Sequence, residues 1–111
     1  MNILFKSSEN LDKRSLYKHM HNEGKSLKDV EDGTEIEPIE IVVYEDINNR
    51  GETQTITSVL GADGEYYSTN SRFFREDLSD IYNLMAPDAF TIVVRKEVSK
   101  AGRTFIKCLL K

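Results

Sequence analysis

A small, mainly β fold with two helices is predicted by the order of hydrophobic patterns along the 111-residue chain. Three strand-like runs come first, within residues 34–69, and one helical run follows at 72–85. Two further strands within 89–110 are joined by a basic turn that contains glycine. This succession is the chain order of an OB-type barrel, which has five strands with a helix between the third and the fourth. We therefore expect one OB-like domain, with an N-terminal helical extension at 1–33 and the barrel at 34–111.

The N-terminal extension is predicted to hold one amphipathic helix over residues 11–21, which Asn10 can cap. Leu16 and Met20 stand four positions apart, so they form an apolar stripe that can dock on the barrel. The stretch 25–30 is expected to add one further helical turn. His19 and His21 are two positions apart, which points them to different sides of a helix, and we interpret both as exposed to solvent.

The barrel strands are predicted from runs of β-branched and aromatic residues. The first strand covers 34–45, where Pro38 indicates an edge, a bulge or a late entry into pairing. The turn at 48–51 makes a hairpin with a Thr-rich second strand at 52–60. A short third strand is expected at 65–69.

The second helix is predicted at 72–85, with a cap at Asn70-Ser71 and an end before Pro87. Its apolar residues are spaced for one buried face: Phe74, Leu78, Ile81, Leu84 and Met85. A strand at 89–98, a turn at 99–103 and a last strand at 104–110 complete the sheet. Cys108 lies within the last strand, where a small buried thiol is the expected role.

Length and composition describe an ordinary globular domain, with 39% hydrophobic and 31% charged residues. The longest apolar run, residues 41–44, is far shorter than the roughly 20 residues that cross a bilayer. The N-terminus lacks the pattern of a secretory signal, and the single cysteine cannot form an internal disulfide. We therefore expect a cytoplasmic protein without membrane partners.

The charge is distributed unevenly along the chain. Residues 1–94 carry 9 Lys/Arg against 18 Asp/Glu, a net charge of −9, whereas residues 95–111 carry 6 against 1, a net charge of +5. The segment 29–46 holds eight acids and no base. The domain should therefore have one region that attracts phosphate and one that repels it, unless these charges only solubilise the ends of strands.

Binding of single-stranded nucleic acid requires a basic groove for phosphates and aromatic side chains on which bases stack. Most of the candidates for both lie in the second half of the sequence, with Phe73 as a further aromatic at the start of the helix. The predicted nucleic-acid-binding residues are the cations Arg50, Arg95, Lys96, Lys100, Arg103 and Lys107 and the aromatics Tyr44, Tyr66, Tyr67 and Phe105. Because Tyr66 and Tyr67 are adjacent, one should face outward if the other faces the core.

No catalytic, metal or cofactor site is predicted. The sequence has no His/Cys cluster that would complete a zinc site and no glycine-rich phosphate loop. The acids of residues 29–46 are interpreted as a solvated strand face rather than a metal cluster. We therefore expect a protein that is not an enzyme.

Several short stretches together resemble a known family. They are Asn10-Leu11-Asp12-Lys13-Arg14 with Leu16-Tyr17, Tyr44-Glu45-Asp46 before Gly51-Glu52, Thr69-Asn70-Ser71 followed by Phe74-Arg75, and Ser99-Lys100-Ala101-Gly102-Arg103. In their order and spacing, the chain resembles the small single-stranded-DNA-binding proteins in replication modules of phages and prophages of Gram-positive bacteria. The resemblance implies protection of single-stranded DNA during phage replication or recombination, in the host cytoplasm and alongside phage replication proteins.

Two other functions stay open at this stage. An OB-like protein-interaction module, such as a phage inhibitor of a host factor, would use the acidic segment 29–46 as its active surface. A divalent-metal nuclease would cleave DNA in the presence of magnesium. The sequence leaves open whether the chain forms a homo-oligomer.

Overall fold

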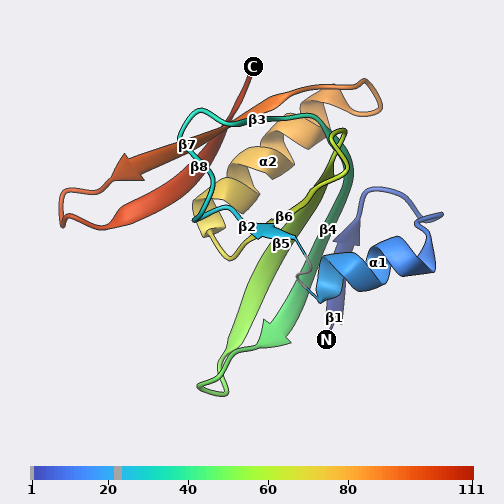
Figure 1. The fold of residues 1–111 in the computed structure, drawn as a ribbon, viewed down its shortest axis with the longest axis horizontal. Helices are drawn as coiled ribbons and strands as arrows, with labels where there is room; N and C mark the ends of the chain where they lie inside the picture. The colour runs from blue at the N-terminus through green and yellow to red at the C-terminus, as the bar shows by residue number, and fades with distance from the viewer. Residues whose placement is uncertain (1, 22–23) are drawn as a thin grey trace.

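The computed structural model describes residues 2–21 and 24–111. Two helices and eight strands follow one another in these parts of the chain (Figure 1). In chain order they are β1 (Asn2–Lys6), α1 (Lys13–Met20), β2 (Lys25–Ser26), β3 (Glu35–Ile36), β4 (Pro38–Ile47), β5 (Thr53–Gly61), β6 (Tyr66–Thr69), α2 (Arg72–Met85), β7 (Ile92–Val98) and β8 (Thr104–Leu110).

The strands form two sheets instead of one barrel. A five-stranded sheet has the order β1-β4-β5-β6-β2, and a three-stranded sheet has the order β3-β7-β8. The mainly β character with two helices is confirmed, but the predicted OB-like barrel is not: the five-stranded sheet does not close, and the last hairpin pairs with β3 in a second sheet. The chain changes sheet between Ile36 and Pro38, where proline cannot donate a ladder hydrogen bond and the β4–β5 register shifts.

The main core lies between the five-stranded sheet on one side and α2 with the three-stranded sheet on the other. Phe74 and Leu78 of α2 are buried against Ile41 of β4, and Val94 and Ile106 of the second sheet join the same cluster. Figure 1 shows α2 lying between the five-stranded sheet and the β7–β8 hairpin. This packing fixes the position of the β7–β8 hairpin relative to the start of α2.

The opposite face of the five-stranded sheet is covered by α1. Leu16 and Met20 pack on a second buried cluster that contains Val42, Tyr44 and Ile56. The predicted apolar stripe of this helix is therefore confirmed, although the helix begins after Asp12, whose carboxylate accepts a hydrogen bond from the Arg14 N–H at 3.2 Å.

The segment 1–33 contains more than the predicted helix. Residues 2–6 form β1, the outer strand next to β4, and residues 25–26 form β2, which pairs in parallel with β6. The predicted helical turn at 25–30 is thus replaced by a short strand followed by turns. The sequence of β1, Asn-Ile-Leu-Phe-Lys, does not alternate between apolar and polar residues, and the two residues of β2 are too few for a period to be read.

Two hairpins extend beyond the core as arms, made by β4–β5 and by β7–β8 (Figure 1). The tip of the first arm is held by the Asn48 side chain, whose amide oxygen accepts from the N–H groups of Arg50 at 2.9 Å and Glu52 at 3.0 Å. At the tip of the second arm, Gly102 has φ +81°, a conformation that side chains with a Cβ rarely adopt. The predicted turns at 48–51 and 99–103 are confirmed.

Several other local predictions are confirmed. The helix at 72–85 and the strand at 104–110 have the predicted bounds, and Ser71 is the N-cap of α2. Pro38 lies at a register irregularity, and Cys108 is 2% exposed. No helix in the part of the chain that the structure describes has the length and apolar character needed to cross a lipid bilayer.

Candidate nucleic-acid interface

A trough runs from the β7–β8 arm past the start of α2 to strand β5. It consists of two adjoining pockets, of about 460 and 150 Å³, which share Lys28, Thr69 and Asn70. We call it the basic trough and define it by Lys28, Asn70, Arg72, Phe73, Lys96 and Phe105. Its lining includes Thr104 of the β7–β8 arm and Gln54 of the β4–β5 arm, so it reaches both arms.

The charges that line the basic trough are positive. Lys28, Arg72 and Lys96 contribute to its walls, and no Asp or Glu is among the lining residues. The Lys96 ammonium donates to the Lys28 carbonyl at 2.7 Å, which holds Lys96 at the wall. Arg72 also pairs with Glu76 outside the trough, at 2.7 Å. The trough therefore offers positive charge to phosphate groups.

Two aromatic rings meet at one wall of the trough. The Phe73 side chain is 52% exposed, and its ring centroid lies 5.1 Å from that of Phe105 at an interplanar angle of 50°. The start of α2 is tied to β8 by Ser71, whose hydroxyl donates to the Ile106 carbonyl at 2.6 Å and accepts from the Phe74 N–H at 3.2 Å. Through this link the two phenylalanines are held together as an accessible apolar surface on which bases can stack.

The cations of the β7–β8 arm divide between two faces because side chains alternate along a strand. Lys96 pairs with Ile106 and lies on the face toward the core and the trough, whereas Arg95 pairs with Lys107 on the other face. The Arg95 guanidinium lies 3.9 Å from Asp32. The structure therefore brings Lys96 to the trough and leaves Arg95 and Lys107 outside it.

The remaining predicted cations lie at the tips of the arms. Lys100 and Arg103 are exposed in the turn of the β7–β8 arm, and Arg50 is exposed at the tip of the β4–β5 arm. Among residues 2–21 and 24–111, no side chain forms an ion pair with any of these three cations. The tips are thus free to meet phosphates.

The predicted tyrosine platforms are corrected by the structure. Tyr44 is 0% exposed and Tyr67 is 5% exposed, while Tyr66 is half-buried. Because α1 covers the face that carries Tyr44 and Tyr66, and the main core covers the face of Tyr67, neither face of the sheet is open at these positions. Tyr67 donates to the Asp63 carboxylate at 2.6 Å, and burial together with this bond raises the pKa of Tyr67 to about 12.

A buried polar network beneath α1 replaces the predicted exposed histidine. His19 is 0% exposed, with Nδ1 2.7 Å from the Ser58 hydroxyl and Nε2 2.9 Å from the Glu40 carboxylate. Ser15 donates to the same carboxylate, and its hydroxyl lies 2.7 Å from the Tyr66 hydroxyl. Burial lowers the pKa of His19, although Glu40 acts in the opposite direction.

The Ser–His–Glu composition of this network resembles that of a hydrolytic triad. Ser58, however, is only 1% exposed. A buried hydroxyl cannot reach a substrate, so the network anchors α1 to the sheet. His21 remains exposed, as predicted, and stacks on Tyr17 with ring centroids 4.0 Å apart.

The acids of residues 29–46 are distributed over different partners. The Asp32 carboxylate accepts a hydrogen bond from the backbone N–H of Lys96 at 2.8 Å. Glu35 pairs with Lys111 at 2.8 Å, and Glu40 belongs to the network beneath α1. The segment therefore does not form one solvated strand face. Within the described part of the chain, no group of three or more His, Cys, Asp or Glu side chains is placed to hold a metal ion.

Some residues of the trough carry no recognisable signal in the sequence. Lys28, Asn70 and Arg72 were not among the predicted binding residues, and only their neighbours in space make them candidates. Phe73 is the second residue after the Ser71 helix cap, which was the one sequence signal for its position. The binding roles of the trough and of the arm cations remain predictions.

A basic trough beside an exposed aromatic ring is typical of surfaces that bind single-stranded nucleic acid. The sequence model of the family described as phage single-stranded DNA-binding protein matches residues 3–111. This chain therefore belongs to that family of phage single-stranded DNA-binding proteins.

Individual relatives agree with this assignment. The single-stranded DNA-binding protein of Bacillus phage B103 is 33% identical over 93 residues, which cover 78% of this chain and 76% of the relative. Those of Bacillus phages PZA and phi29 are each 30% identical over 93 residues, covering 78% of this chain and 75% of the relative. No solved structure matches the chain.

Proposed function

We propose that this protein binds single-stranded DNA, without catalysing a reaction, during phage DNA replication or recombination in the host cytoplasm. Membership of the phage single-stranded DNA-binding family supports the ligand. The observation that carries the proposed location is the Phe73–Phe105 pair beside the cations of the basic trough.

Phosphates and bases would be bound by different parts of this surface. Lys28 and Lys96 meet the backbone in the trough, Lys100 and Arg103 meet it at the tip of the β7–β8 arm, and bases stack on the phenylalanine pair. One stacked base contributes roughly 1–3 kcal/mol. Four phosphate contacts give a slope of log affinity against log salt of about −2.8, at about −0.7 per contact on single strands. A duplex keeps its base faces inside the stack and gains only the phosphate contacts.

The test is fluorescence anisotropy of a labelled oligo-dT at about 50 and about 200 mM salt, with a duplex of the same length for comparison. The double variant Lys100→Ala/Arg103→Ala should bind more weakly and should lose about 1.4 from the magnitude of the salt slope. Lys13→Ala/Lys18→Ala on α1 removes the same charge from another element and is the matched control.

The possible outcomes separate the function from its location. A folded wild-type protein that does not bind oligo-dT at low salt would refute the proposed function. Equal effects of the two double variants would refute a specific role of the arm and leave only a general effect of net charge.

A further inference from the structure

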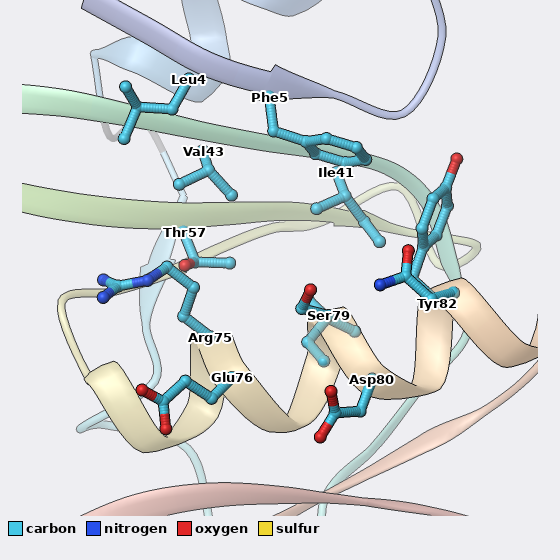
Figure 2. Close-up of a pocket in the computed structure, with 12 residues that line it drawn as sticks. Leu4, Phe5, Ile41, Val43, Thr57, Arg75, Glu76, Ser79, Asp80 and Tyr82 are labelled. Carbon is cyan, nitrogen blue, oxygen red and sulfur yellow. The ribbon is translucent and has the colours of Figure 1, made fainter.

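A second groove lies between α2 and the five-stranded sheet, with a volume of about 470 Å³ (Figure 2). We call it the α2 groove. It is lined by Leu4, Phe5 and Val43 on the side of the sheet and by Arg75, Asp80 and Tyr82 on the side of the helix. None of its lining residues is shared with the basic trough, so the two surfaces can be occupied at the same time.

Strand β1 presents unusually exposed apolar side chains to this groove. Leu4 is 51% and Phe5 is 37% exposed, and the rings of Phe5 and Tyr82 make a T-shaped contact with centroids 5.3 Å apart. The register between β1 and β4 shifts between Ile3 and Phe5, which leaves Leu4 without a partner on β4. This bulge allows two consecutive side chains to reach the same groove.

The free edge of β1 adds backbone groups to this apolar surface. β1 is the last strand of its sheet and pairs only with β4 among the described strands. Its outward N–H and C=O groups can therefore pair with an extended segment, while alternate side chains of that segment enter the groove.

One wall of the groove contains a buried hydroxyl without a hydrogen bond. Thr57 is 1% exposed, and its Oγ1 has no hydrogen-bond partner in the described part of the chain. Figure 2 shows Thr57 on the sheet wall opposite Arg75 of α2. The Thr57 hydroxyl itself is buried, so a ligand oxygen can reach only the half-buried Arg75 guanidinium of this pair.

The charges at the groove distinguish a protein ligand from DNA. Asp80 lies on the α2 side and forms no ion pair within residues 2–21 and 24–111, whereas Glu76, one helical turn earlier, is paired with Arg72. The unpaired Asp80 carboxylate repels phosphate and attracts a lysine or arginine. The basic trough has no acid among its lining residues, so the two surfaces have opposite preferences.

We propose that the α2 groove binds an extended segment of a partner protein, which pairs with the edge of β1. The segment has apolar side chains for Leu4 and Phe5, a carbonyl or carboxylate oxygen for Arg75, and a lysine or arginine for Asp80. Because the groove and the trough share no residue, the protein can hold the partner in the groove while DNA stays bound in the trough.

The test uses a displayed library of random nine-residue peptides, selected on the immobilised 111-residue chain. Selected peptides should combine apolar residues at alternate positions with a lysine or arginine. Synthetic copies should lose at least about tenfold in affinity for Leu4→Gln, the effect of losing roughly one buried leucine side chain. Leu84→Gln makes the same change at a 78% exposed position of α2 outside the groove, and it should leave affinity unchanged.

A further variant tests the charge argument. Asp80→Asn should abolish the advantage of lysine-containing peptides over their glutamine counterparts. The folded state of each variant is checked by circular dichroism, and oligo-dT binding is measured on the same samples. Because wild-type DNA binding is measured separately, failure of the proposed function does not affect the result for peptides.

Three results would overturn the proposal. They are a selection that yields no peptide above background, equal losses for Leu4→Gln and Leu84→Gln, and unchanged lysine preference in Asp80→Asn. A loss of oligo-dT binding in Leu4→Gln, with Leu84→Gln unaffected, would also overturn it, because the groove would then belong to the path of DNA.

Discussion

Replacing Phe73 by alanine is expected to weaken binding of single-stranded DNA by about 5- to 150-fold. The magnitude follows from the loss of one stacking ring, which contributes roughly 1–3 kcal/mol per base. The stability of the protein should change little, because the Phe73 side chain is 52% exposed and its main ring contact is Phe105. Alanine is also the better helix former at this position in the first turn of α2, by up to about 0.7 kcal/mol.

The assay is anisotropy of a labelled oligo-dT at one fixed salt concentration, followed by a salt series. Phe73→Ala removes no charge, so the salt slope should stay the same while the affinity falls. Phe73→Trp keeps a stacking surface and should restore most of the affinity. Tyr17→Ala is the control, because Tyr17 is an aromatic residue with a similar exposure of 56% on α1.

Two results would refute the reasoning. An unchanged affinity in folded Phe73→Ala would show that bases do not stack on this residue. A smaller salt slope would show that the substitution disturbs the phosphate contacts of the neighbouring cations instead of a stacking surface.

Three predictions concern the folded state. Burial lowers the pKa of His19 below 6.5, so just below that pH the unfolded chain binds more protons than the folded one. The urea concentration at the unfolding midpoint should therefore decrease when the pH is lowered from 7.5 to 5.5. The decrease should be smaller in His19→Gln. An equal pH effect in both proteins would contradict this. Ser71→Ala should lower the free energy of unfolding in urea by about 0.5–2 kcal/mol, because α2 loses its N-cap and its hydrogen bond to Ile106. An unchanged midpoint would show that the Ser71 cap does not stabilise the fold. Burial raises the pKa of Cys108 to about 12, so a thiol reagent should label it only on unfolding, and rapid labelling of the native protein would disprove this.

Elements with local signals were predictable from the sequence. The bounds of α2 follow from the Ser71 cap, the spacing of Phe74 and Leu78, and the break at Pro87, all of which act within a few residues. The turn at 99–103 follows from its glycine in the same way. For the candidate site, these local signals were sufficient to place Lys100 and Arg103 at an exposed tip and Lys96 on the strand before it.

The sequence by itself determined the helices, the principal hairpins, the basic character of the last strands and the resemblance to phage single-stranded DNA-binding proteins. Only the tertiary structure decided that β8 pairs within a second sheet, that Tyr44, Tyr67 and His19 are buried, and that Phe73 lies beside Phe105. The physical reason is that strand partners and covered faces depend on contacts between distant segments. A residue's own neighbours in sequence set its local conformation, whereas its exposure is set by whatever segment packs on it.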